Sequence, residues 1–405
     1  MRTGSALWGH GLVPDGAWRP GRKRMLGVAV LGATGSVGRQ TLDVIARCGG
    51  RLRAVALAAH ADGAGLTELA TAHQVSLVGL ASEAPATPLG DGPWRSVVGQ
   101  GALEAAATAP GVDVVVAATP GLAALRAVLA ALSLGRRVAL ANKEILIAGG
   151  DLIARAVRAH GGLLLPVDSE HVAVHQLLRH EPPEAVARVV LTASGGPFRR
   201  TPRAGLAAVG AAAALAHPTW RMGPMNTLNS ATLMNKGFEV LEAMRLFGLE
   251  AARVAVVVHP QSVVHSFVEL VDGTVLAQLA SADMRLPIQY ALLYPDRAPS
   301  AAPRLDLWQT PALDLEPVRE ADFPSLSVAV AAGKIGGTAP AVLVAANEEA
   351  VSAFVVGRLG FLEIPEVVRT VLGQAPPAAV DSIEDVERAD AWARGQARRL
   401  LGADA

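Results

Sequence analysis

Short apolar segments alternate with helical segments over the first 170 residues of the chain. A glycine-rich turn follows the first apolar segment and opens the first helix. We expect strands at 28–31, 55–57, 112–117, 138–141 and 163–167, and helices at 39–47 and 122–134. Because such alternation is typical of a parallel sheet with helices on both faces, the pattern predicts a doubly wound, Rossmann-type α/β domain.

The pattern changes after residue 168. A helix is expected to about residue 179, a strand at 189–192, and antiparallel strands at 254–258, 263–271 and 274–279, with Asp272-Gly273 as the hairpin turn between the last two. The Ala-rich stretch 204–216 predicts a buried or lid-flanking helix, and Ser230 is expected to cap a helix that runs to residue 247. This region is therefore α+β, with a mixed or antiparallel sheet.

Composition and pattern together predict five segments. They are a disordered extension or mis-assigned start (1–24), a cofactor-binding domain (25–166), a catalytic domain (167–298) with a lid (217–223), a Pro-rich linker (299–318) and a C-terminal helical bundle (319–405). No apolar segment follows the early basic residues, so a signal peptide is not expected, and Met25 is an alternative start.

Charge and cysteine content exclude some classes of protein. Lys and Arg number 36, as do Asp and Glu, whereas nucleic-acid-binding proteins usually carry a basic excess. No apolar run reaches the ~18 residues of a membrane span. The lone Cys48 allows no internal disulfide, which fits the cytoplasm, and we expect it to be a buried small side chain rather than a catalytic thiol.

The first candidate site is the turn with Gly32, Gly35 and Gly38. Glycines allow the backbone to approach a pyrophosphate, and the following helix N-terminus supplies amide donors. The turn therefore predicts a dinucleotide site, although a glycine-rich turn without ligand has the same sequence.

Two carboxylates, Asp168 and Glu170, follow the last strand of the first region. Residues i and i+2 at a strand end point to the same side, and at 4 Å their repulsion costs about 4 kcal/mol at an effective dielectric near 20. A divalent cation with oxygen ligands, Mg²⁺ or Mn²⁺, removes that cost. The alternative is a solvated pair at a helix start.

The helix after Ser230 carries a polar face with Asn235, Lys236 and Glu239, three and four residues apart. The alternative for this face is a surface ion pair. Gly237 inside the helix costs about 1 kcal/mol relative to Ala, which indicates a close approach to another element.

Two further groups of side chains have the spacing or composition of a site. The stretch 217–223 contains His217, Trp220 and Met222, and it predicts either a water-excluding lid or a loop anchored by Trp. His171 and His175 have zinc-like spacing, but no Cys or third His supports zinc.

The chain resembles the 1-deoxy-D-xylulose 5-phosphate reductoisomerase family in a set of ordered motifs from about residue 27 to 371. They are Gly-Ala-Thr-Gly-Ser-Val-Gly (32–38), Ala-Asn-Lys-Glu (141–144), Val-Asp-Ser-Glu-His (167–171), Ser-Gly-Gly-Pro-Phe (194–198), His-Pro-Thr-Trp-Arg-Met-Gly (217–223), Asn-Ser-Ala-Thr-Leu-Met-Asn-Lys-Gly (229–237), His-Pro-Gln-Ser (259–262), Asp-Met-Arg (283–285), Gly-Gly-Thr-Ala-Pro-Ala-Val (336–342) and Ala-Ala-Asn-Glu (345–348).

The resemblance implies a cytoplasmic homodimer that converts 1-deoxy-D-xylulose 5-phosphate into 2-C-methyl-D-erythritol 4-phosphate, an isoprenoid precursor, with NADPH and Mg²⁺ or Mn²⁺. The implied cofactor residues are Thr34, Gly35, Ser36, Val37, Asn142, Glu144 and Gly223. The implied metal ligands are Asp168, Glu170 and Glu239, which with Lys143 form the catalytic group. The implied substrate residues are Lys143, Ser169, Glu170, Ser194, His217, Trp220, Met222, Ser230, Asn235, Lys236 and Glu239.

One departure and two alternatives remain. Where the adenosine ribose is expected, the chain has His60-Ala61-Asp62, and an acid there favours NADH over NADPH. The alternatives are a paralogous metal-dependent NAD(P) oxidoreductase that acts on a related sugar phosphate or phosphonate, and a non-catalytic paralogue that binds a sugar phosphate.

Overall fold

The computed structural model describes residues 11–13, 25–216, 223–310 and 312–402, which fall into two compact units. The first unit comprises Met1–Ile145, Ile153–Pro182 and Asp283–Arg304, and the second comprises Leu146–Leu152, Pro183–Ala282 and Leu305–Ala405. Each unit is described by itself below. No helix in the described ranges is both long and apolar enough to cross a membrane.

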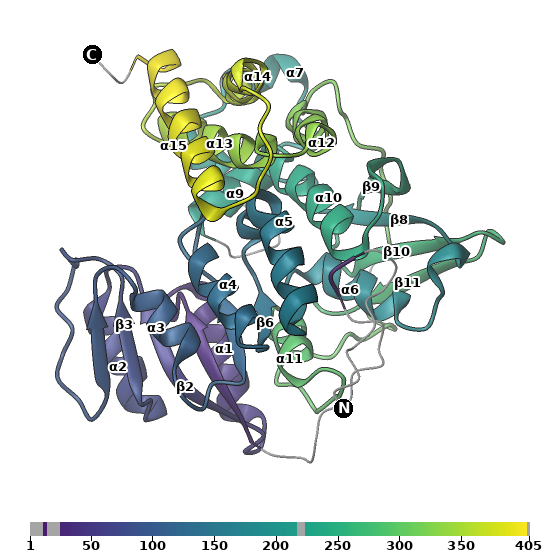
Figure 1. The fold of residues 1–405 in the computed structure, drawn as a ribbon. Helices are drawn as coiled ribbons and strands as arrows, with labels where there is room; N and C mark the ends of the chain where they lie inside the picture. Colours follow the sequence, from purple (N-terminus) through teal and green to yellow (C-terminus); the bar gives the residue numbers. More distant parts are fainter. Residues whose placement is uncertain (1–10, 14–24, 217–222, 311, 403–405) are drawn as a thin grey trace. The chain divides into compact units, whose positions relative to one another are not determined.

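The first unit contains a seven-stranded, wholly parallel sheet (Figure 1), in the order β4-β3-β2-β1-β5-β6-β7. Its strands are β1 (Leu26–Leu31), β2 (Leu52–Ala59), β3 (Leu77–Leu80), β4 (Arg95–Val98), β5 (Val114–Ala117), β6 (Arg137–Leu140) and β7 (Leu163–Pro166). The order reverses between β1 and β5, so the carboxyl ends of these two strands mark the crevice where such sheets bind ligands.

Apolar side chains explain why these segments form a sheet covered on both faces. Strands β1, β5 and β7 are almost continuously buried, as strands with helices on both sides are. The helices of this unit are α1 (Ser36–Arg47), α2 (Gly63–His73), α3 (Ala102–Thr108), α4 (Leu125–Ser133), most of α5 (Lys143–His160), α6 (Ser169–Leu178) and α11 (Arg285–Leu293). The expected Rossmann-type domain is confirmed, and Cys48 is buried as expected.

Helix α11 joins this unit from far along the chain, and Arg137 of β6 helps to hold it. The buried guanidinium donates to the carbonyl oxygens of Leu292 at 2.7 Å and Tyr294 at 2.8 Å, at the C-terminal end of α11. A cation at a helix C-terminus is favoured by the helix dipole. Burial lowers the pKa of Arg137 to about 10, which still leaves it charged at neutral pH.

The second unit contains a four-stranded sheet in the order β11-β10-β8-β9. Its strands are β8 (Val186–Ala193), β9 (Val254–Val258), β10 (Val264–Leu270) and β11 (Val275–Leu279). The turn at Asp272-Gly273 is confirmed between β10 and β11. The sheet is mixed: β10 pairs antiparallel with β8 and β11, as expected, but the expectation that 254–258 is antiparallel is wrong, since β9 runs parallel to β8. The long connection between β8 and β9, which includes several helices, permits a parallel crossover.

Two helix predictions in this unit are also wrong. The stretch 204–216 forms two four-residue helices, α7 (Arg203–Leu206) and α8 (Ala211–Ala214), with Gly210 between them, instead of one helix. Ser230 lies in the last turn of α9 (Pro224–Ala231) and does not cap α10 (Met234–Phe247). Leu233 separates the two helices because its φ of 62° is left-handed and ends the helical path.

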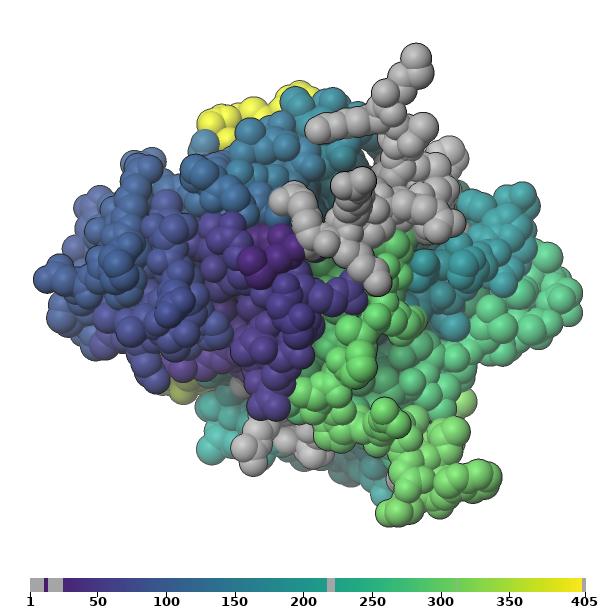
Figure 2. Space-filling model, turned by 90° about the horizontal axis from the view of Figure 1, so that it is seen from below, coloured from purple at the N-terminus to yellow at the C-terminus, as the bar shows by residue number. Residues whose placement is uncertain are grey.

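Helices also form the C-terminal part of the second unit, as expected. They are α12 (Ser325–Ile335), α13 (Ala339–Val355), α14 (Ile364–Gln374) and α15 (Ile383–Leu400). Short 3-10 turns lie at Pro183–Ala185, Ala251–Arg253 and Phe361–Glu363. Over the described part of 299–317 there is no helix or strand, and a single bridge pairs Glu316 with Val258. In Figure 2 the described residues from 25 to about 100, in purple and blue, form one continuous surface.

Candidate active site

The glycine-rich turn lies at the carboxyl end of β1 and leads directly into α1. Gly32 has a φ of 86°, and a Cβ atom on Gly38 would lie 2.2 Å from the carbonyl oxygen of Gly32. These two glycines therefore allow the turn and the helix to pack closely. No side chain caps α1, and Gly35 and Ser36 are exposed, so the amides of this helix N-terminus face solvent where an anion can bind.

Asn142 fixes the neighbouring edge of this crevice. Its Oδ1 accepts a hydrogen bond from the amide of Ile145 at 2.8 Å and so caps α5. Its Nδ2 donates to the carbonyl oxygens of Thr119 and Gly121, in the loop that follows β5. Asn142 and Glu144 are both buried at the start of α5. The predicted cofactor residues Thr34, Gly35, Ser36, Val37, Asn142 and Glu144 thus follow β1 and β6, two strands of one sheet that both pair with β5.

Asp62, the departure from the family pattern, has a structural role. Its Oδ1 accepts a hydrogen bond from the amide of Gly65 at 2.9 Å and caps α2. The hydroxyl of Thr87 donates to the same oxygen at 3.3 Å. The acid is thus used to begin a helix, which the sequence alone did not indicate.

Asp168 and Glu170 begin helix α6 in the first unit. Strand β7 ends at Pro166, so the expected strand-end alternation is wrong, and Asp168 is the N-cap residue of α6. Its Oδ1 accepts from the amide of Glu170 at 3.1 Å and faces Nδ1 of His171 at 3.1 Å, while Oδ2 pairs with the ammonium of Lys143. The hydroxyl of Ser169 donates to Glu170. Lys143, Ser169, Asp168 and Glu170 are therefore brought together.

His171 was not predicted as a site residue. It is fully buried beside Asp168, three residues later on the same helix, and this spacing is the only signal the sequence offers. His175 instead faces the hydroxyl of Tyr290 at 3.0 Å. The two histidines therefore have different partners.

In the second unit, the predicted polar face of α10 is confirmed. The amide of Asn235 donates to Oε1 of Glu239 at 2.6 Å, and the ammonium of Lys236 contacts Oε2 of Glu239 and the carbonyl oxygen of Thr192. Lys236 is 4% exposed and Glu239 is 1% exposed, so the surface ion pair that was the alternative is ruled out. A buried ion pair of this kind contributes little to stability, which favours a functional explanation.

Two serines, Ser194 after β8 and Ser230 at the end of α9, lie on segments that pack against each other. The loop after β8 turns at Gly196, where a Cβ atom would lie 2.9 Å from the carbonyl oxygen of Ser230. Within the loop, the hydroxyl of Ser194 accepts a hydrogen bond from the amide of Gly196 at 3.3 Å. Because Lys236 reaches the end of β8 and this loop packs on the end of α9, the second unit gathers hydroxyl, amide and ammonium groups suited to a phosphate.

The close approach predicted at Gly237 is confirmed. A Cβ atom on Gly237 would lie 2.5 Å from the Cβ of Ala329 on α12. Gly237→Ala should therefore destabilise the protein by about 1–3 kcal/mol through overpacking, measured by chemical denaturation. Adding Ala329→Gly should recover part of the loss.

A control for this prediction is Gly395→Ala on α15, where a Cβ atom meets nothing within 4 Å. That change should leave stability the same or raise it by up to about 1 kcal/mol, because Ala favours helix over Gly. Equal effects at positions 237 and 395 would contradict the packing explanation.

Three predicted residues, His217, Trp220 and Met222, lie outside the described residues. Gly223, the last residue of the predicted lid, is exposed and begins α9 as its N-cap residue.

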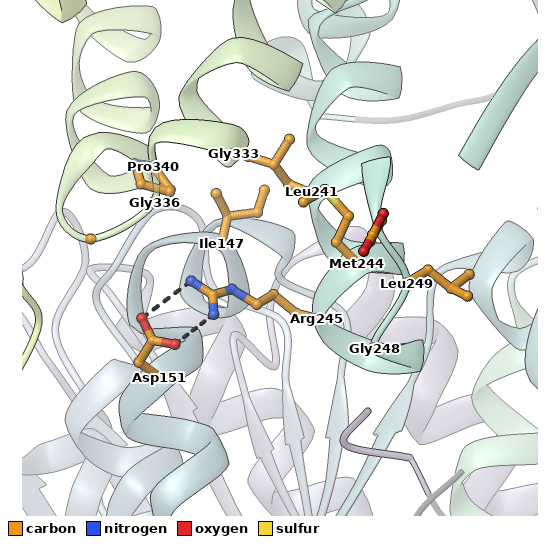
Figure 3. A pocket seen from close by; sticks show the side chains of 12 residues that line it. Ile147, Asp151, Leu241, Met244, Arg245, Gly248, Leu249, Gly333, Gly336 and Pro340 are labelled. Carbon is orange, nitrogen blue, oxygen red and sulfur yellow. Dashed lines mark hydrogen bonds and ion pairs between the residues drawn. The ribbon is translucent and has the colours of Figure 1, made fainter. Parts of the chain in front are cut away.

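A recess of about 430 Å³ in the second unit is lined by none of the predicted site residues (Figure 3). Leu241, Met244 and Ile147 supply apolar walls, and Arg245 pairs with both carboxylate oxygens of Asp151 at 2.5 and 3.2 Å. Glu250 adds an exposed acid to the lining, and no residue of the candidate site reaches the recess, so we do not include it in that site.

Known proteins match almost the whole chain. The family model described as 1-deoxy-D-xylulose 5-phosphate reductoisomerase matches residues 28–150, its C-terminal domain model matches 164–247, and the model described as DXP reductoisomerase C-terminal domain matches 279–396. The 1-deoxy-D-xylulose 5-phosphate reductoisomerase of Thermomicrobium roseum is 47% identical over 380 residues, 93% of this chain and 98% of that protein. That of Xanthomonas oryzae pv. oryzae is 48% identical over 381 residues, 92% of this chain and 96% of that protein.

Solved structures agree. The reductoisomerase from Zymomonas mobilis in complex with NADPH is 42% identical, with a TM-score of 0.86, over 93% of this chain and 99% of that chain. A DOX-P reductoisomerase in complex with NADPH, fosmidomycin and magnesium is 33% identical, with a TM-score of 0.85, over 93% of this chain and 98% of that chain. The chain therefore belongs to the 1-deoxy-D-xylulose 5-phosphate reductoisomerase family.

Proposed function

We propose that this chain rearranges 1-deoxy-D-xylulose 5-phosphate and reduces it to 2-C-methyl-D-erythritol 4-phosphate, with NADPH and a divalent cation. The observation that carries the proposal is the group of Asn235 with the buried Lys236 and Glu239, together with the contact between the loop of Ser194 and the end of α9 at Ser230. This arrangement supplies both a phosphate site and a metal-type carboxylate, as a phosphorylated substrate that reacts next to a cation requires.

The turn after β1 fits NADPH. The uncapped N-terminus of α1 and the absence of side chains at Gly35 and Gly38 suit a pyrophosphate, which we assign to Thr34, Gly35, Ser36 and Val37. The carboxylate of Asp62 caps α2, so this acid has a structural role that does not require a preference for NADH. We assign Asn142, Glu144 and Gly223 to the remainder of the cofactor site.

We assign Asp168, Glu170 and Glu239 as metal ligands. All three offer carboxylate oxygens, which suits Mg²⁺ or Mn²⁺ and not zinc. Lys143 and Lys236 each contact one of these acids, so part of the negative charge is balanced within each unit. A divalent cation held by these acids would act as a Lewis acid that stabilises negative charge on substrate oxygens.

The other residues would orient the substrate. Lys143 and Ser169 carry donors beside Asp168 and Glu170 and can hold the hydroxyl oxygens near the reacting carbons. Lys236, Asn235 and the two serines would bind the phosphate, whose binding energy can orient the rest of the molecule. We propose that His217, Trp220 and Met222 belong to a lid and contact the substrate.

An assay of NADPH oxidation with 1-deoxy-D-xylulose 5-phosphate tests this function. Activity should require added Mg²⁺ or Mn²⁺ and should be lost after exhaustive chelation, because the carboxylates alone cannot stabilise an anionic transition state. Related sugar phosphates and phosphonates serve as matched substrates. Preference for one of these would favour the paralogous oxidoreductase, and binding without NADPH oxidation would favour the non-catalytic paralogue.

We further propose that the chain forms a cytoplasmic homodimer through the second unit. Trp308 is 97% exposed, and exposed apolar residues also line the edge strand β11 at Val275 and Leu279. Exposed apolar patches and open strand edges are typical of protein interfaces. His259 helps to hold the segment around Asp314, which follows Trp308 in the chain, because its Nδ1 lies 2.9 Å from the carbonyl oxygen of Asp314. The lone cysteine supports the cytoplasm.

Trp308→Ser should shift the protein toward monomer at micromolar concentration, since a buried interface aromatic often contributes ≥ ~2 kcal/mol. Sedimentation velocity measures the shift. Val356→Ser, which removes a 65% exposed apolar side chain after α13, is the matched control and should leave the oligomeric state unchanged. An unchanged dimer in the Trp308 variant would place the interface elsewhere.

A further inference from the structure

A pair of buried amides links the C-terminal helices to the end of α9. Asn347 of α13 is fully buried, and its Nδ2 donates to Oδ1 of Asn229 at 2.8 Å. Asn229 is 1% exposed and immediately precedes Ser230. The bond is thus made between two side chains 118 positions apart, with no access to water.

Stability does not explain this pair. Asn347 lies on a helix whose other buried residues are almost all apolar. Its Oδ1 accepts no hydrogen bond from any residue that the structure describes. A buried acceptor left without a donor costs stability, whereas two apolar side chains of similar shape at such positions are usually as stable or better. The polar pair therefore calls for another explanation.

The position of Asn229 supplies one. Its carbonyl oxygen accepts from the hydroxyl of Thr232 at 3.2 Å, and the carbonyl oxygen of Ser230 accepts from the amide of Leu233 at 3.2 Å. These bonds form the tight turn between α9 and α10, in which Leu233 has a left-handed φ. Asn229 thus lies in the last turn of α9, next to Ser230 and directly before the turn that leads into α10, the helix of Lys236.

Helix α13 is a firm support for this turn. Glu348 pairs with Arg394 of α15 at 2.5 Å, and Glu349 pairs with Arg398 at 3.0 Å. Ion pairs to α15 therefore fix α13 next to Asn347, and the turn between α9 and α10 fixes the backbone next to Asn229. A hydrogen bond between two side-chain amides, unlike an apolar contact, also fixes their relative orientation, because the donor and acceptor must be aligned.

We infer that Asn347 is a positioning residue for substrate binding. Through Asn229 it sets the place of Ser230 and of the first turn of α10, and so the shape of the phosphate site. The inference rests on the proposed phosphate role of Ser230. It gives the C-terminal helices a part in the reaction although Asn347 itself need not touch the substrate.

Steady-state kinetics of four proteins tests the inference: wild type, Asn347→Leu, Ser230→Ala and the double variant. Asn347→Leu should raise KM for 1-deoxy-D-xylulose 5-phosphate about tenfold, equivalent to about 1.4 kcal/mol, with kcat changed less than about twofold. Because Asn347 acts through Ser230, its effect should largely disappear in the Ser230→Ala background. Fully additive effects, or an unchanged KM in Asn347→Leu, would overturn the inference.

Two further variants separate positioning from stability. Asn229→Leu with Asn347→Leu replaces both amides, so its melting temperature should be close to that of wild type while KM stays raised; a wild-type KM would overturn the inference. Glu349→Gln on the same helix weakens the pairing with α15 and should leave KM unchanged, and a KM raised as much as in Asn347→Leu would also overturn it. If Ser230→Ala alone binds substrate normally, the proposed phosphate role fails first, and the inference fails with it.

Discussion

Glu239→Gln should lower kcat by about a thousandfold or more in a protein that still folds but is less stable, because the buried ammonium of Lys236 loses its counter-ion. Glutamine keeps the shape and one acceptor oxygen, so Asn235 can still donate to the side chain. The substitution removes the negatively charged carboxylate that we propose as a ligand of the divalent cation. Lewis-acid stabilisation amounts to several kcal/mol, and each 1.36 kcal/mol is tenfold in rate. The kinetic constants at saturating Mg²⁺ measure the effect.

Binding of Mn²⁺, followed by electron paramagnetic resonance, gives a readout independent of turnover. The Glu239 variant should bind Mn²⁺ more weakly than wild type. Glu250→Gln, which neutralises an exposed acid just beyond α10, should change neither the rate nor the binding. If the Glu239 variant bound Mn²⁺ as tightly as wild type and kept its rate, Glu239 would have to be removed from the ligand set.

Local patterns were sufficient for the first strand of the chain and for the turn and helix that follow it. The apolar run at β1 and the glycines after it predict a strand, a turn and a helix, because each of these depends on neighbours in the sequence. The pattern predicted nothing between 63 and 108, where the structure has α2, β3, β4 and α3. Strand β4 is short and mostly exposed at the sheet edge, so it lacks the apolar signal of a buried strand.

The errors in the second unit arise from interactions distant in sequence. No local signal shows that β9 pairs parallel with β8, because pairing is decided by the crossover between them. The sequence from Ser230 to Phe247 has an acceptable cap and helical spacing, yet Leu233 adopts a left-handed conformation. The packing of the turn against other elements therefore outweighs local propensity.

In the candidate site, too, the sequence predicted features that depend on neighbouring residues and missed contacts between distant ones. Spacing on one helix predicted the face with Asn235, Lys236 and Glu239, and the glycine within it predicted a close neighbour. The pairing of Lys143 with Asp168 and the contact of Lys236 with Thr192 join residues 25 and 44 positions apart. No periodicity reports such contacts. The motifs indicated which residues matter, whereas the structure was needed to show what each one contacts.

Lys236→Met should weaken substrate binding and destabilise the protein at the same time. Methionine keeps most of the volume of the side chain but removes the ammonium that contacts Glu239. A buried carboxylate that loses its counter-ion typically costs about 3–5 kcal/mol. Lys236→Met combined with Glu239→Gln leaves no unpaired charge at these two positions, so it should recover most of the lost stability in chemical denaturation while remaining inactive.

The effect of Lys236→Met on KM follows from the phosphate charge. A charge-assisted hydrogen bond to a phosphate contributes about 1.5–3 kcal/mol, so KM should rise by roughly 10- to 150-fold. The measurement is made below the melting temperature, so that only folded protein contributes. Lys334→Met removes an exposed ammonium from α12 and should change neither KM nor stability. A KM equal to that of wild type in the folded Lys236 variant would show that the phosphate is bound elsewhere, and the group of Ser194, Ser230 and Asn235 would then need another ligand.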